Sequence, residues 1–255
     1  MKFKYKIYLS LILYSVVIYV NYLANSLPIG GVTTGEVSDL LYNLFTPTGF
    51  TFSIWGVIYL SLLIFLLSLF SVSEKFIPFI GKVLMLFNIS CLLNISWIFA
   101  WHYKLLPLSL IIMLFLLYNL ILISRVIKHN YRDFKSTYLY NITSFSFNIY
   151  FGWITVATIA NFTGLLVFFN WDGFGVSHEV WTSVIILVAT SIAFLTFIKN
   201  EAIWYLMPII WAFYGIYYKH SGILENNYPL IIFFLLFGIC ILSLSLLRKL
   251  FYSFK

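Results

Sequence analysis

Long apolar stretches alternate with short polar segments along most of the chain. A transmembrane helix needs about 20 mainly apolar residues, and each stretch comes close to that length or exceeds it. The pattern therefore predicts an all-α, polytopic membrane helix bundle with about eight transmembrane helices. The predicted spans are residues 7–25, 50–72, 83–102, 105–124, 143–169, 181–198, 202–218 and 227–247.

The first stretch also has a feature of a signal peptide, because Lys2, Lys4 and Lys6 precede it. A signal peptide ends at a cleavage site of small residues, and no convincing site of this kind follows. The stretch is also about long enough to cross a bilayer. We therefore interpret residues 7–25 as the first membrane span.

The composition agrees with a chain embedded in lipid. Hydrophobic residues make up 62% of it and charged residues 9%, and the mean hydropathy is +1.00. A soluble domain usually carries about 25% charged residues. Cys91 and Cys240 fall inside predicted spans without a Cys-x-x-Cys spacing, so we interpret both as small apolar residues rather than as a disulfide or a metal pair.

The 15 Lys and Arg residues are divided unevenly between the two sides that eight spans create. All except Lys104 and Lys219 fall on the side that holds both termini. Loops rich in Lys and Arg stay in the cytoplasm, so we predict a multi-pass protein of the cell (inner or plasma) membrane with both termini cytoplasmic. The net charge of +7 then marks orientation and contact with lipid headgroups. No basic tract with the aromatic pattern of an RNA-binding sheet is present, so no nucleic acid partner is predicted.

The predicted spans carry no ionisable residue near their middle. Proton-coupled carriers usually need one at depth, and intramembrane metalloproteases need H-E-x-x-H. A b-type haem needs axial imidazoles inside the bilayer, whereas His102, His178 and His220 fall on the outer rim and His129 in an inner loop. We therefore predict no metal site, no cofactor and no catalytic residue of these types.

Aromatic and amide side chains recur at helical spacing in three spans. Residues three or four apart share one face of a helix. Converging faces of this kind predict an apolar cavity with a few polar groups, the usual form of a small-molecule site. The candidate ligand-binding residues are Trp55, Tyr59, Asn94, Trp97, Tyr150, Trp153, Ala157 and Asn161.

Packing and anchoring explain part of the same pattern. Trp101, Trp171, Trp181 and Trp204 lie near span ends, where Trp anchors helices at the membrane surface. Asn and Thr in membrane helices often form hydrogen bonds to a neighbouring helix. For Asn161, packing is therefore as good an explanation as ligand contact, and the residues alone leave both open.

The order of these motifs resembles the TspO/MBR family, the tryptophan-rich sensory proteins related to the mitochondrial translocator (peripheral benzodiazepine receptor) protein, and in particular its longer bacterial branch. Trp55 and Tyr59 match the motif of the family's second helix, and Asn94 and Trp97 match N-x-x-W in its third. The four candidates in residues 143–169 match Y-x-x-W-x-x-x-A-x-x-x-N in its fifth. The resemblance implies a TspO-like five-helix core at residues 1–169, followed here by three additional transmembrane helices at 170–255.

The resemblance also implies a function: an integral membrane sensory protein that binds a planar hydrophobic ligand, such as a porphyrin or another tetrapyrrole, in an intramembrane aromatic pocket. The alternatives are a porphyrin-degrading enzyme and a facilitator or transporter of a hydrophobic solute. A non-catalytic subunit of a larger assembly is the fourth reading. The expected partners are the ligand and the lipid bilayer, with a homodimer among the assemblies left open.

The segment before the second predicted span departs from the family pattern. Leu41 stands in place of the family's Trp, Thr46 in place of its Lys, and only Pro47 remains of a Pro pair. The whole connection at residues 26–49 is long and has little periodicity, which is typical of a lid or binding loop. We predict that it covers the outer mouth of the cavity; the alternative is a simple solvated connector.

Overall fold

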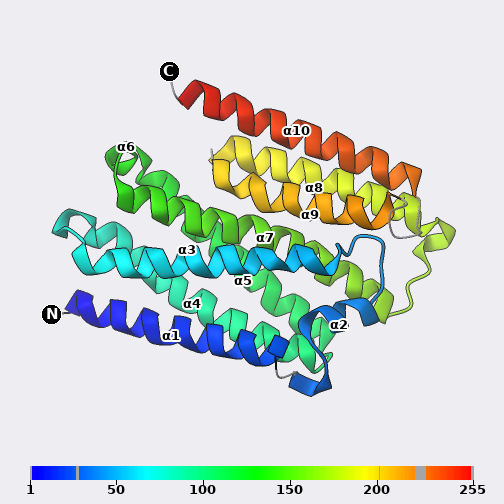
Figure 1. Ribbon diagram of the computed structural model, residues 1–255, viewed down its shortest axis with the longest axis horizontal. Helices are drawn as coiled ribbons and strands as arrows, with labels where there is room; N and C mark the ends of the chain where they lie inside the picture. Colours follow the sequence, from blue (N-terminus) through cyan, green and yellow to red (C-terminus); the bar gives the residue numbers. More distant parts are fainter. Residues whose placement is uncertain (1, 27–28, 201, 222–227, 254–255) are drawn as a thin grey trace.

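The computed structural model describes residues 2–26, 29–200, 202–221 and 228–253. Within these ranges the chain is helical and contains no strand, which confirms the polytopic helix bundle (Figure 1). The long helices are α1 (Lys2–Ser26), α3 (Ile54–Ser68), α4 (Ile77–His102), α5 (Leu106–His129), α7 (Tyr138–Phe168), α8 (His178–Asn200), α9 (Ile203–His220) and α10 (Pro229–Ser253). Two short α-helices, α2 (Thr34–Leu40) and α6 (Tyr131–Phe134), and short 3-10 turns at Ile29–Gly31, Gly49–Ser53, Leu69–Ser71, Glu74–Phe76 and Gly173–Gly175 connect them.

Successive long helices run in opposite directions along the bundle (Figure 1). Both ends of the chain therefore lie at the same end of the molecule. The opposite end holds α2 together with the segments that lead into α3 and α8, and it is called the α2 end below.

Seven helical segments of the described chain are long and apolar enough to cross a membrane, not the eight predicted. The exception is α9, which corresponds to the predicted span at 202–218. It has 18 residues, includes Pro208 and ends in Lys219 and His220. It also contains six Trp and Tyr residues. It lies alongside α8 and α10 (Figure 1) and packs on α7, so much of its surface contacts protein.

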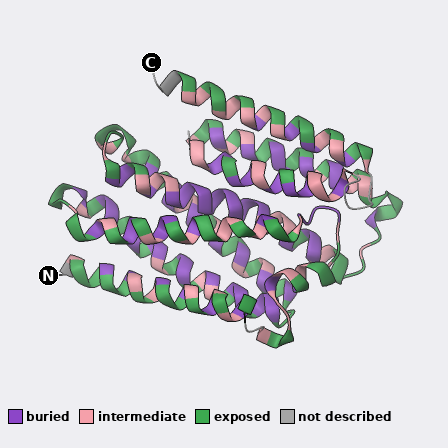
Figure 2. Ribbon diagram, in the orientation of Figure 1, coloured by how far each residue is buried: buried purple, intermediate pink, exposed green. Residues whose placement is uncertain are grey.

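The central helix of the bundle is α7, where buried positions are most frequent (Figure 2). Its N-cap is Thr137, whose side chain accepts a hydrogen bond from the Tyr140 backbone N–H at 3.3 Å. Helices α3, α5, α8 and α9 all pack on it. On the α9 side the two backbones meet at Gly152, where a Cβ atom would overlap the carbonyl oxygen of Tyr205 and the ring of Pro208.

The connection between α1 and α3 is ordered and contains a helix that the sequence pattern did not predict. Thr33 caps α2 by accepting from the Glu36 backbone N–H, while the Glu36 carboxylate accepts from the Thr33 N–H at 2.6 Å. This reciprocal arrangement satisfies two donors that a helix start otherwise leaves free. After α2 the chain is irregular, with a turn at residues 44 and 45, and residues 44–47 are buried although they belong to no helix.

Candidate ligand-binding cavity

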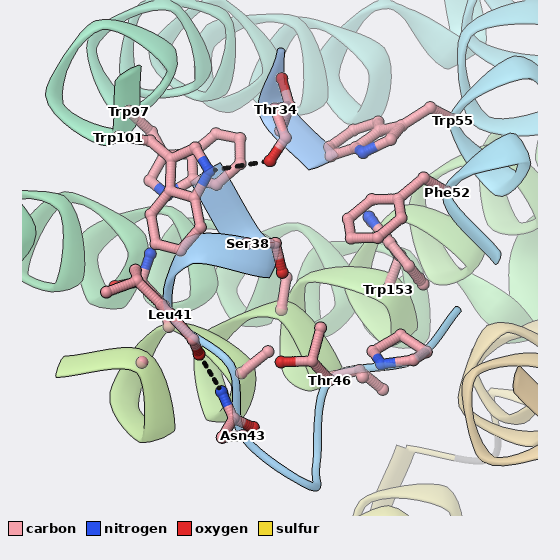
Figure 3. A pocket seen from close by; sticks show the side chains of 16 residues that line it. Thr34, Ser38, Leu41, Asn43, Thr46, Phe52, Trp55, Trp97, Trp101 and Trp153 are labelled. Carbon is pink, nitrogen blue, oxygen red and sulfur yellow. Dashed lines mark hydrogen bonds between the residues drawn. The ribbon is translucent and has the colours of Figure 1, made fainter. Parts of the chain in front are cut away.

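Tryptophans from three helices line one cavity near the α2 end (Figure 3). Trp55 comes from the first turn of α3, Trp97 from the last turns of α4 and Trp153 from the middle of α7. Phe52, in the turn before α3, packs edge-on against Trp153 with ring centroids 5.8 Å apart. The convergence expected from helical register is therefore present in the structure.

One face of α7 forms a wall of the cavity. Trp153, Ala157, Ala160, Asn161 and Gly164 all line it, at the three- and four-residue spacing that keeps side chains on one side of a helix. The small residues in this set leave room beside the indole, because their side chains project little from the helix.

The connection at residues 26–49 covers the cavity at the α2 end. Its lining residues are Thr34, Ser38, Leu41, Asn43, Thr46 and Pro47. Asn43 shapes the stretch that follows α2: its side chain donates to the Leu41 carbonyl at 3.0 Å and accepts from the Phe45 N–H at 3.1 Å. The Trp101 indole donates to the Thr34 carbonyl at 3.2 Å (Figure 3), which ties α2 to α4.

The cavity is small in this conformation, with a volume of about 50 Å³. That is room for a few water molecules, whereas sites for drug-sized ligands measure about 300–1,000 Å³. A basin of about 570 Å³ between α1, α3 and α4 adjoins it. Thr34, Phe52, Trp55 and Trp97 line both volumes and so lie between them.

Three buried polar atoms at the cavity have no hydrogen-bond partner within the described protein: the indole nitrogens of Trp97 and Trp153 and the side-chain oxygen of Asn161. Trp153 and Asn161 are each only 3% exposed. A buried indole N–H normally finds an acceptor, and buried polar groups without partners are rare enough to need an explanation. Residues that line the cavity thus carry two donors and one acceptor for which the described protein supplies no partner.

Asn161 combines a helix-packing contact with a place at the cavity. Its amide nitrogen donates to Ser109 on α5 at 2.8 Å, which is a helix-packing contact. Its oxygen is the unpartnered atom that lines the cavity. The same side chain therefore joins two helices and presents an acceptor to the cavity.

The other candidate residues lie beside the cavity or below it. Tyr59 stacks on Trp55 with ring centroids 5.2 Å apart and lines the adjoining basin. Tyr150 packs edge-on against Trp55 at 5.8 Å, and its hydroxyl accepts from the Asn94 amide at 3.4 Å. Asn94 in turn accepts from Asn21 on α1 at 3.1 Å. Asn94 and Tyr150 do not line the cavity; Tyr150 packs against the lining residue Trp55.

Sequence reasoning missed the contribution of Trp101, which lines the cavity and is 6% exposed. Its place near the end of a span suggested a lipid anchor, but the indole points into the protein, where α2 supplies its acceptor. Its spacing of four residues from Trp97, on which it stacks at 5.9 Å, was the available signal.

Among the residues that the structure describes, no ionisable side chain lines the cavity. Outside the lining, Lys219 at the end of α9 donates to the carbonyl of the lining residue Thr46 at 2.9 Å. Burial lowers the pKa of Lys219, and the charge of Asp39 acts in the opposite direction. No cluster of three or more His, Cys, Asp or Glu residues occurs in the described part of the chain. The lining therefore consists of aromatic and other apolar side chains with a few neutral hydroxyl and amide groups.

The geometry defines a class of protein: a helical membrane bundle with an aromatic, uncharged cavity closed by the connection between its first two membrane spans. The family model of TSPO-like proteins matches residues 7–248, and the chain belongs to that family. The match includes α8, α9 and most of α10, so it extends well beyond the 1–169 core on which the motifs lie. No curated protein and no solved structure matches the chain.

Proposed function

We propose that this TSPO-like protein binds a planar hydrophobic ligand of the tetrapyrrole type in the cavity between α2, α3, α4 and α7. The observation that carries the proposal is the set of unpartnered polar atoms on Trp97, Trp153 and Asn161. Their burial without partners is costly unless a ligand or ordered water completes the hydrogen bonds. The four indole rings at the cavity offer flat surfaces on which a conjugated ring system can stack.

Binding requires the cavity to open, because its present volume is far below that of a tetrapyrrole. The adjoining basin supplies the missing space on the side of α1, and Phe52, Trp55 and Trp97 form the partition. The structure then corresponds to the closed, ligand-free state of a site that opens as the ligand enters.

A titration of the purified protein with protoporphyrin, followed by tryptophan fluorescence, tests the proposal. Trp153→Phe keeps an aromatic ring but removes one of the unpartnered N–H donors. A weaker stacking contact and one lost hydrogen bond together should reduce affinity about 5- to 150-fold, which corresponds to roughly 1–3 kcal/mol.

Trp204→Phe is the matched control, because Trp204 lies on α9 outside the cavity and packs against Phe145. It should leave affinity unchanged. Saturable binding by the wild type that Trp153→Phe weakens and Trp204→Phe does not would support the proposal. Equal titration curves for all three proteins would contradict it.

We also infer that the end of the bundle that holds both chain termini faces the cytoplasm and that the α2 end faces outward. The support is the distribution of Lys and Arg, which leaves only Lys104 and Lys219 at the α2 end. Labelling of a single cysteine at position 252, with Cys91 and Cys240 replaced by Ser, tests this. Reaction of intact cells with a membrane-impermeant thiol reagent at that position would overturn the orientation.

A further inference from the structure

Helix α9 holds the non-helical segment at residues 44–47, which lies at the cavity. Residues 44–47 are buried outside any helix, and buried carbonyl groups need donors. Lys219 donates to the Thr46 carbonyl at 2.9 Å, and the His220 ring donates from Nε2 to the Leu44 carbonyl at 2.8 Å. Two successive residues at the end of α9 therefore supply donors to this short stretch.

The attachment continues along α9 toward the start of α3. The Trp211 indole donates to the Thr51 carbonyl at 2.9 Å, and the Thr48 hydroxyl donates to the Gly215 carbonyl at 3.4 Å. Trp211, Gly215 and Lys219 are spaced four residues apart and so share one face of the helix. One face of α9 thus contacts residues 44–51, which are distant from it in the sequence.

The contact is close enough to depend on glycine. A Cβ atom at Gly215 would overlap the hydroxyl oxygen of Thr51 and lie 3.2 Å from the Cβ of Pro47. Pro47 itself lines the cavity. Any larger residue at 215 would therefore push the closing segment away from α9 and into the cavity space.

A cation from α9 also contacts an aromatic ring of the connection between α1 and α3. The Lys219 ammonium lies 4.8 Å from the centre of the Tyr42 ring, within the range of a cation–π contact. Together with the bond to Thr46, this contact lets one partly buried side chain bridge two residues on either side of Asn43, the residue that shapes the turn. Loss of the ammonium would leave the Thr46 carbonyl without its donor.

We propose that α9 is the latch of the cavity: Trp211, Lys219 and His220 are positioning residues that hold segment 42–53 in the closed conformation. Ligand entry and exit then require release of these bonds, so the C-terminal helices control a site whose walls lie on α3, α4 and α7. The effect on ligand exchange rests on the proposed function; the latch itself does not, because it is a property of the ligand-free protein.

Hydrogen–deuterium exchange of the full-length protein in lipid nanodiscs tests the latch without any ligand. Lys219→Met keeps an unbranched side chain of similar length and removes the ammonium. Amides in segment 42–53 should then exchange about 10-fold faster, since a hydrogen bond from a charged donor is lost. Exchange in α5 and α7 should not change. Lys104→Met, which removes the other cation of the α2 end, is the control and should match the wild type throughout.

Two further variants keep the test decisive if Lys219→Met loosens the whole protein. Trp211→Phe retains an aromatic ring without the N–H donor, and His220→Phe retains the ring that packs edge-on against Tyr228 at 5.1 Å. A local rise in exchange within segment 42–53 in these variants supports the latch. Wild-type exchange of that segment in both variants overturns it.

Protoporphyrin release from the same proteins then separates the latch from the proposed function. Faster release by about 10-fold in Lys219→Met, with local loss of protection, supports both. If Lys219→Met loses protection in segment 42–53 but neither the variant nor the wild type binds protoporphyrin, the proposed ligand is refuted and the latch stands. Unchanged protection with tight protoporphyrin binding refutes the latch alone.

Discussion

Two faces of helix α7 differ in whether their buried polar groups have hydrogen-bond partners. On the face toward α9, the Thr155 hydroxyl donates to the Phe151 carbonyl at 3.0 Å and accepts from the Tyr205 hydroxyl at 3.2 Å. On the face toward α3 and α4, the Trp153 nitrogen and the Asn161 oxygen have no partner. One face is fully packed and satisfied, whereas the other borders a cavity and is not.

The difference shows that polarity in a membrane helix is not by itself a sign of a site. Asn148 accepts from Ser124 at 3.3 Å and donates to Ser144 at 3.1 Å, and Thr158 donates to the Ile154 carbonyl at 2.7 Å. These groups serve packing and the helix backbone. On α7, only Trp153 and Asn161 combine deep burial, a place at the cavity and a polar atom without a partner.

The largest effect is expected on the packed face, from Gly152→Ala. The new Cβ would overlap the Tyr205 backbone, so α7 and α9 must move apart. Overpacking of this kind costs roughly 1–3 kcal/mol and more where backbone must shift, and the thermal midpoint should fall clearly. Gly56→Ala on α3 is the control, because nothing lies within 4 Å of a Cβ there; it should be neutral or stabilising by up to about 1 kcal/mol. Equal stability of both variants would show that the two helices are not in close contact.

Helical periodicity predicted the register of these faces well. Trp153, Ala157 and Asn161 share a side because an α-helix repeats every 3.6 residues, and Trp55 and Trp97 face the same cavity for the same reason. Such predictions use only local geometry. They could not reveal which polar atoms find partners, because those partners lie on other helices.

Contacts between segments that are distant in the sequence could not be predicted from its pattern. Lys219 and His220 read as the polar end of a span, yet their donors satisfy carbonyls of residues 44 and 46. Thr46 stands where the family motif has a Lys, and the structure brings the Lys219 ammonium to its carbonyl oxygen. Length and composition alone do not identify α9 as a span, yet it packs on α7 and α10 within the bundle, so its own apolarity is a poor guide to its place.

A second comparison uses Asn161, which forms a packing bond to α5 and also lines the cavity. Asn161→Leu removes the bond to Ser109 and also the free oxygen at the cavity. Ser109→Ala removes the same bond but leaves the Asn161 oxygen in place. Both variants should lose about 0.6 kcal/mol of stability, the average for a hydrogen bond between membrane helices. Only Asn161→Leu should also weaken protoporphyrin binding, by about 10-fold if one ligand hydrogen bond worth ~1.4 kcal/mol is lost.

Thermal unfolding and fluorescence titration of the two variants check this expectation. Because the stability losses match, any difference in affinity is due to the cavity oxygen alone. Equal affinities for Asn161→Leu and Ser109→Ala would assign Asn161 to packing and remove it from the site.

The smallest effect should come from Thr155→Val, which changes the packed face without altering its volume much. The variant loses the acceptor for the Tyr205 hydroxyl, which is then buried without that partner. The cost should be near 0.6 kcal/mol, as for other intramembrane hydrogen bonds, and thermal unfolding should detect a small decrease. Protoporphyrin affinity should stay at the wild-type value, because Thr155 points to α9 and does not line the cavity. A Thr155→Val protein with wild-type stability and reduced affinity would reverse the roles assigned to the two faces of α7.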